Sequence, residues 1–150
     1  KEDNSQYQVD TVQSYLEGMG YTCTQYSFSD SNDIAAVCQT AADNSDVLYV
    51  PTDNSAASNT PVIDNICRGN IPVFCGEEGI CKGCGVATLS ISYYDIGYKT
   101  GEMAAQVLTG QADISTMPIE YAPEFVQKYN PSMCEALGLT APDGYVAIEE

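Results

Sequence analysis

Three short apolar runs constrain the fold of this chain more than any other feature. VLYV (47–50) is a continuous apolar run, which is typical of a strand buried on both faces of a parallel sheet, and IPVFC (71–75) and VATLSI (86–91) are predicted to be the next two strands. Segments with helical spacing of apolar residues lie before, between and after these runs. This alternation predicts an α/β fold, a Rossmann-like domain of three layers with a mainly parallel sheet.

Apolar residues spaced three and four positions apart predict the helices, and stretches rich in β-forming residues predict further extended segments. We expect helices over 5–19, 32–42, 93–109 and 131–137, a strand over 21–28, an extended segment over 117–125 and a loop over 138–150. In the helix over 93–109, Ile96, Met103, Ala104, Val107 and Leu108 are expected to face inward. Asn54 or Ser55 is expected to cap a further helix. Pro61 predicts either a kink in it or a second start with Thr60 as cap. We assign 1–150 to a single α/β lobe, with 126–150 as its C-terminal extension.

Charge and composition exclude several classes of function. The formal net charge of −16 repels phosphate backbones, so nucleic acid is not an expected partner. The chain has no histidine, which removes the Ser-His and Cys-His nucleophile systems and histidine metal ligands. No apolar run approaches the roughly 20 residues needed to span a bilayer. Any catalysis would have to use carboxylate, lysine or thiol side chains. Together with the resemblance described below, this predicts a protein that is not an enzyme and that uses no cofactor and no metal.

The seven cysteines raise an alternative function. Cys81 and Cys84 form a C-x-x-C pair, which occurs in thiol redox sites and in metal sites. A redox pair is expected at the start of a helix, whereas this one is followed by the predicted strand over 86–91. Cys38, Cys67 and Cys75 fit apolar patterns and are predicted to be small buried side chains. We retain a thiol redox or metal-binding domain using Cys81 and Cys84 as the second hypothesis.

Polar segments follow the predicted strands at the places where ligands bind in open α/β sheets, beyond the carboxyl ends of the strands. These segments are EDNS (2–5), PTDNS (51–55), GEEG (76–79) and SISYY (90–94). Their side chains could accept hydrogen bonds from an ammonium or hydroxyl group, although each type is also a common cap or turn former. The candidate ligand-binding residues are Asn4, Ser5, Asp53, Asn54, Glu77, Glu78 and Ser92.

The sequences VLYVPTDNSAAS, IPVFCGEEGICKGCGVATLSISYYDIGYKTGEMAAQVLTG and MPIEYAPEF resemble the carboxyl-terminal half of ABC-importer solute-binding proteins of the TrpX type, the family that contains tryptophan-binding receptors. The resemblance covers nearly the whole chain. It implies one lobe of a type I periplasmic-binding fold, in which two lobes close on a small molecule. It also places the EDNS, PTDN and EEG segments at the cleft, which adds Thr52 to the candidate residues.

The resemblance further implies the partners and the location. A small molecule, an amino acid and in particular an aromatic one, would bind between this lobe and the amino-terminal lobe of the same protein. An ABC permease would receive it. The protein would be extracellular or periplasmic, anchored to the membrane through a lipid. A dimer of the isolated chain is a further open alternative. The chain departs from the family at Ser92, where we expect an aspartate before the tyrosines, and at Cys81 and Cys84.

Overall fold

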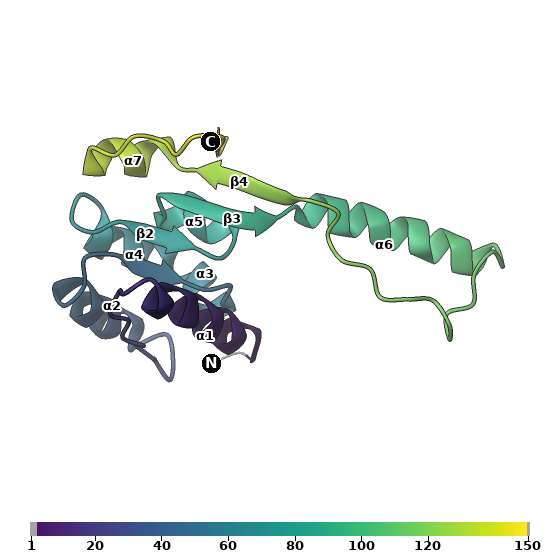
Figure 1. Ribbon diagram of the computed structural model, residues 1–150, viewed down its shortest axis with the longest axis horizontal. Coiled ribbons are helices and arrows are strands. Elements are labelled where there is room, and N and C mark those ends of the chain that lie inside the picture. The colour runs from purple at the N-terminus through teal and green to yellow at the C-terminus, as the bar shows by residue number, and fades with distance from the viewer. Residues whose placement is uncertain (1–2, 150) are drawn as a thin grey trace. The chain divides into compact units, whose positions relative to one another are not determined.

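The computed structural model describes residues 3–149, and the side chains of residues 5–149 (Figure 1). Its helices are α1 (Asp3–Gly18), α2 (Ile34–Asp43), α3 (Asn54–Ser58), α4 (Thr60–Cys67), α5 (Glu78–Cys84), α6 (Tyr93–Leu108) and α7 (Pro131–Leu137). Its strands are β1 (Leu48–Val50), β2 (Val73–Cys75), β3 (Ala87–Ile91), β4 (Phe125–Tyr129) and β5 (Val146–Ala147). The chain divides into two compact units, of which Ser90–Val126 is the second. The first contains the residues up to Leu89 and those from Gln127 onward.

The strands form one sheet in the order β1-β2-β3-β4-β5. β1 pairs with β2, β2 with β3, and β4 with β5, all in parallel. Figure 1 shows β4 running in the opposite direction to β3, so the sheet is mixed but mostly parallel. The predicted mainly parallel sheet is confirmed.

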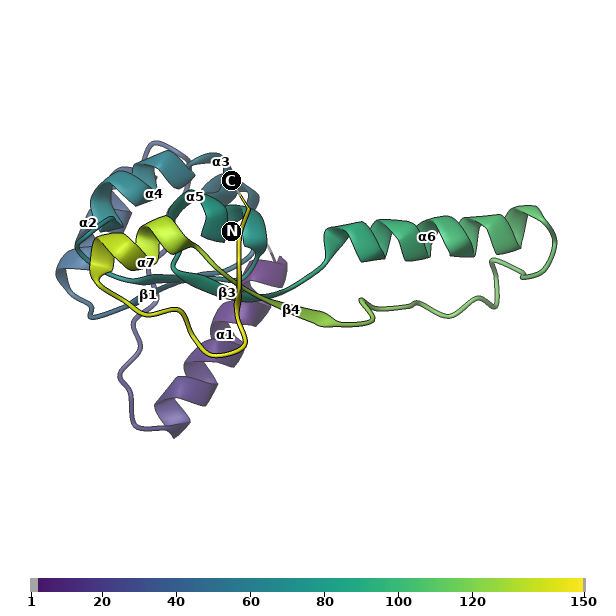
Figure 2. The ribbon, with the colours of Figure 1, turned by 90° about the horizontal axis from the view of Figure 1, so that it is seen from above.

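Helices cover both faces of the sheet in the first unit. Figure 2 shows α1 on one face and α2, α4, α5 and α7 on the other. The two faces are not covered equally: Val73 and Cys75 are buried in the core with α4 and α5, whereas Phe74 between them is exposed on the opposite face, so β2 is buried on one face only. A second, smaller core lies where α7 packs beside β3. The predicted three-layer α/β architecture is therefore confirmed.

Most predicted helices form close to their expected bounds, and the position of Pro61 decides between the two alternatives for the region after Asn54. α3 ends at Ser58 and α4 begins at Thr60 with Pro61 in its first turn, so the helix restarts rather than kinks. A proline fits there because the backbone amide that it lacks would have no partner inside the helix. Two predicted caps are wrong by one or two residues: the cap of α4 is Asn59 rather than Thr60, and the cap of α3 is Asp53 rather than Asn54 or Ser55.

Three predictions of local structure are wrong. Residues 21–28 form no strand, because the sheet ends at β1 and no neighbouring strand in the described chain pairs with them. The extended segment predicted over 117–125 is not among them, since residues 117–122 have no regular secondary structure and β4 begins at Phe125. Residues 78–84, interpreted as part of a loop, form α5 because the Glu77 side chain caps the helix and Ile80, Cys81 and Cys84 are buried beneath it. The tail over 138–150, expected to be loop, contains the short strand β5.

The second unit consists of α6 and the irregular segment that follows it. Ser92 caps α6 by accepting a hydrogen bond from the backbone N–H of Asp95 at 3.1 Å. Lys99 forms an ion pair with Glu120 of the following segment at 3.0 Å, and this carboxylate raises the pKa of Lys99. The predicted inward face of α6 is wrong as stated. No residue of α6 is buried, and Leu108 is 87% exposed. One helix with an irregular segment offers no second layer in which to bury that face.

Candidate functional site

The turns that follow β1 and β2 lie side by side in the first unit. The backbone N–H of Gly76, directly after β2, donates to the carbonyl of Val50 at the end of β1 at 2.8 Å. The hydroxyl of Thr52 donates to the carbonyl of Gly76 at 3.3 Å. These contacts join PTDN and GEEG at the carboxyl edge of the sheet, as the parallel topology predicts.

Two side chains from the first turns of α1 hold the turn after β1. The Gln8 amide oxygen accepts from the backbone N–H of Thr52 at 2.7 Å, and its amide nitrogen donates to the Thr52 hydroxyl at 3.1 Å. The Ser5 hydroxyl donates to the carbonyl of Thr52 at 2.7 Å. Both the backbone and the side chain of Thr52 are therefore fixed by α1.

Gln8 is a positioning residue that the sequence reasoning did not select. The available signal was its place one helical turn after Ser5, which puts both residues on one face of α1. The same contact explains Gly76. A Cβ atom at this position would lie 2.8 Å from the Gln8 amide oxygen and 2.8 Å from the backbone nitrogen of Thr52. Only glycine fits between α1 and the two turns without a shift of the backbone.

Asp53 is buried and caps α3 through one carboxylate oxygen. Oδ1 accepts from the backbone N–H of Ala56 at 2.9 Å. Oδ2 lies 3.5 Å from the Ser5 hydroxyl. Because a hydroxyl has one proton, and that proton has a much shorter bond to the Thr52 carbonyl, Oδ2 retains most of its capacity to accept hydrogen bonds. Asn54 follows as the first residue of α3 and is exposed.

The two adjacent glutamates have different environments. Glu77 caps α5 with both carboxylate oxygens, one accepting from the backbone N–H of Gly79 at 2.9 Å and the other from that of Ile80. Glu78 is the first residue of the helix and is half-buried. Glu77 is therefore committed to its own helix, whereas Glu78 makes no such cap.

The structure brings together part of the predicted set. Ser5, Thr52 and Asp53 are linked directly, and the turn with Glu77 and Glu78 adjoins them. Ser92 belongs to the second unit, where it caps α6. The side chain of Asn4 lies outside the described part of the structure.

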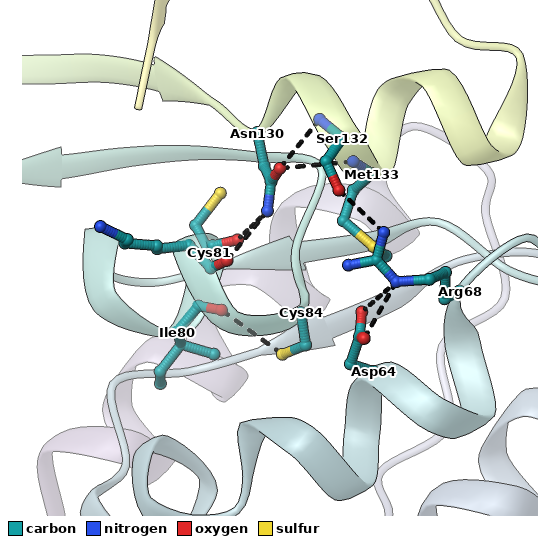
Figure 3. Close-up of polar contacts among 9 residues, drawn as sticks. Asp64, Arg68, Ile80, Cys81, Cys84, Asn130, Ser132 and Met133 are labelled. Atoms are coloured by element: carbon teal, nitrogen blue, oxygen red, sulfur yellow. Dashed lines mark hydrogen bonds and ion pairs between the residues drawn. The ribbon is translucent and has the colours of Figure 1, made fainter. Parts of the chain in front are cut away.

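The far end of α5 is held by Asn130 (Figure 3). Its amide nitrogen donates to the carbonyls of Cys81 and Lys82 at 3.1 and 3.0 Å. Its amide oxygen accepts from the backbone N–H groups of Ser132 and Met133 and so caps α7. One buried side chain thus joins the end of α5 to the beginning of α7.

The C-x-x-C pair does not have the features of a redox or metal site. Cys81 and Cys84 are fully buried at the end of α5, away from its N-terminus. Cys75 lies against both thiols. The pKa of the Cys75 thiol is raised well above its ordinary value by these contacts and by burial. Within residues 5–149, no three cysteine or acidic side chains are placed to hold a metal ion. The predicted burial of Cys67 and Cys75 is confirmed, and Cys38 packs against the same core.

A sequence profile described as ABC transporter substrate binding protein matches residues 1–148. The chain belongs to this family. A curated relative, the tyrosine-binding protein of Clostridioides difficile (strain R20291), is 34% identical over 119 residues, which are 79% of this chain and 34% of the relative. The family consists of solute-binding proteins that are extracellular or periplasmic, which agrees with the prediction of a protein that is not an enzyme.

Solved structures of substrate-binding proteins match almost the whole chain. A ligand-free, open structure of a substrate binding protein with adhesive properties from Clostridium difficile has 33% identity and a TM-score of 0.76. It matches over 99% of this chain and 51% of its own. The ABC domain in complex with L-Trp from Streptococcus pneumoniae has 28% identity and a TM-score of 0.85 over 99% of this chain and 53% of its own. The chain thus spans about half the length of these structures and about a third of the curated relative. Within residues 3–149, no helix has both the length and the apolar character needed to cross a membrane.

Proposed function

We propose that this chain is one lobe of the receptor of an ABC importer and that it binds an amino acid with an aromatic side chain. The observation that carries the proposal is the joined pair of turns after β1 and β2, fixed by Ser5 and Gln8 of α1. We call these two turns, residues 51–54 and 76–79, together with Ser5 and Gln8, the rim. The rim lies at the carboxyl edge of the parallel strands, which is where ligands bind in open α/β sheets. Related proteins support the ligand class, since one is named for tyrosine and another was solved with L-Trp.

The chemistry of the rim favours a ligand with an ammonium group. Asp53 has one carboxylate oxygen with spare acceptor capacity, and Glu78 is the first residue of α5, directly after the turn that follows β2. The net charge of −16 attracts a cationic group toward the protein. We assign ligand contacts in the first unit to Asn4, Ser5, Thr52, Asp53, Asn54 and Glu78, with Gln8 and Glu77 as positioning residues.

The remaining contacts belong to a second lobe. In our proposal the amino-terminal lobe of the same protein closes over the ligand, and the closed form is recognised by an ABC permease. Closure is driven by tighter binding of the ligand to the closed state than to the open one. The receptor operates outside the cytoplasmic membrane and is held there by a lipid anchor.

The test is a thermal-shift screen of the full-length protein against the aromatic amino acids, aliphatic amino acids and simple sugars. We expect the largest increase in Tm with an aromatic amino acid, because a ligand at 100 times its Kd stabilises the folded state by about 2.7 kcal/mol. Calorimetry then gives the affinity. A shift with sugars and none with amino acids would contradict the proposed ligand class.

The residue-level test is Asp53→Asn. Asparagine is also a good helix cap, so the fold is retained while the negative charge is lost. We expect the affinity for the aromatic amino acid to fall about tenfold or more, since a hydrogen bond to a charged group contributes about 1.5–3 kcal/mol. Asp143→Asn is the matched control, because Asp143 is exposed on the C-terminal tail. Equal affinities of the two variants would exclude Asp53 from ligand binding.

A further inference from the structure

Two cysteines on neighbouring helices face each other outside the ligand-binding rim. α2 and α4 lie beside each other on the same face of the sheet (Figures 1 and 2). The Sγ atoms of Cys38 on α2 and Cys67 at the end of α4 are 3.8 Å apart. Cys67 is one helical turn after Ile63, which is also buried, so the core-facing side of α4 carries the thiol toward α2.

The two thiols differ in access to solvent. Cys67 is fully buried, whereas Cys38 is half-buried at the edge of the core. The hydrogen bond between the two sulfur atoms lowers the pKa of Cys38, while the same bond and burial raise the pKa of Cys67. A reagent in solution can therefore reach Cys38 first, and the thiolate that attacks such reagents forms most readily there.

We propose that Cys38 and Cys67 form a reversible disulfide, by exchange with a small disulfide in the surroundings, and that this bond ties α2 to α4. The two Sγ atoms are 3.8 Å apart and need to approach to about 2.0 Å to form the bond. Rotation of the two side chains and a small shift of α2 can provide this movement. The site is independent of the proposed ligand and lies on elements that do not contribute to the rim.

The exchange proceeds in two steps. The Cys38 thiolate attacks one sulfur of the small disulfide, whose S–S bond breaks and releases one thiolate, and this takes up the proton lost by Cys38. The Cys67 sulfur then attacks Sγ of Cys38 in the mixed disulfide and displaces the second small thiol, which carries away the Cys67 proton. Two cysteine thiols are oxidised and one small disulfide is reduced to two thiols.

The other cysteines do not offer an equivalent pair. Cys75, Cys81 and Cys84 are at most 2% exposed, and Cys134 is also buried, so small disulfides cannot reach them in the folded state. Cys23 is half-buried but contacts no other sulfur within residues 5–149. The structure therefore favours one pairing among the many that seven cysteines allow.

The test is treatment of the purified protein with oxidised glutathione, followed by alkylation of the remaining thiols, digestion without reductant and mass spectrometry. We expect one cross-linked peptide joining Cys38 to Cys67, the loss of two titratable thiols and an increase in Tm. Dithiothreitol should reverse all three changes. A cross-link between any other two cysteines, or no cross-link in protein that remains folded, would overturn the proposal.

Two variants separate the roles of the thiols. Cys67→Ser should accumulate glutathione on Cys38, because the second step is lost while the first is retained. Cys38→Ser should take up no glutathione at Cys67, which is buried. The matched control is Cys23→Ser, which should retain the Cys38–Cys67 cross-link. If Cys67→Ser does not fold, Cys67→Ala serves the same purpose. Glutathione on Cys67 of the Cys38→Ser variant would refute the proposed order of attack.

Discussion

Asn130→Ala should destabilise the first unit, because this one buried side chain makes hydrogen bonds to both α5 and α7. The substitution removes the cap of α7, which contributes about 1 kcal/mol. It also leaves the carbonyls of Cys81 and Lys82 without their donor, and leaving a buried polar group unpaired costs about 1–3 kcal/mol. Because the hydrogen bond to the Lys82 carbonyl is only partly buried, water can replace that one. The expected loss in free energy of unfolding is about 2–4 kcal/mol.

A second variant divides this loss into its two parts. Asn130→Asp keeps an acceptor for the amides of Ser132 and Met133, but it places a carboxylate against the two carbonyls at the end of α5 (Figure 3). It should therefore remain destabilised by about 1–3 kcal/mol. The control is Asn44→Ala, which removes an amide with one exposed hydrogen bond to the Thr40 carbonyl and should cost no more than about 0.5 kcal/mol.

Urea unfolding provides the measurement, since a lower midpoint at an unchanged m-value reports a change in stability alone. If Asn130→Asp were as stable as the unsubstituted protein, the capping of α7 would account for the whole effect. The link between Asn130 and the end of α5 would then contribute nothing. If Asn130→Ala and Asn44→Ala lost the same small amount, the reasoning from burial would be refuted.

Two further predictions concern the rim. Gly76→Ala should lower the stability by about 1–3 kcal/mol and weaken ligand binding, because the new Cβ meets the Gln8 amide and the Thr52 backbone. Urea unfolding and calorimetry on the one protein check both effects, and Gly101→Ala on α6, where a Cβ meets nothing, is the control. Glu77→Ala should cost about 0.5–2 kcal/mol of stability through the lost cap of α5, and a variant as stable as the unsubstituted protein would contradict this role.

The elements that could be predicted from the sequence are those that local residue patterns determine. Strand β1 is marked by a continuous apolar run, β2 and β3 by short segments rich in apolar residues, and α7 by Pro131 in its first turn. Residues 21–28 show the limit of this reasoning. Their composition favours a strand, but a strand in a sheet needs hydrogen bonds to a neighbouring strand. The composition of residues 21–28 does not show whether such a partner strand lies beside them.

Helix α5 was not predicted because its composition disfavours a helix, although the structure contains one. Its residues, EGICKGC, include two glycines and two cysteines, which are poor helix formers. The helix forms because Glu77 caps its beginning, Asn130 satisfies its last carbonyls, and three of its side chains fill the core. Only the Glu77 cap is local in sequence. Tertiary contacts therefore decided this segment, and pattern alone could not predict it.

The same distinction explains which part of the candidate site was foreseen. Parallel strands place their carboxyl ends at one edge, so the meeting of the turns at Thr52 and Gly76 follows from topology. The role of Gln8 depends on the position of α1 across the sheet, which the sequence does not specify.

The acidic residues of the rim are not equivalent, although the sequence presents them as one class. Both oxygens of Glu77 accept hydrogen bonds from backbone amides, so its charge is largely offset by the beginning of α5. Asp53 uses one oxygen for its cap, and the other has only a long contact. In the proposed function, an ammonium group would therefore gain most from Asp53 and Glu78, whereas Glu77 would hold the turn in its shape.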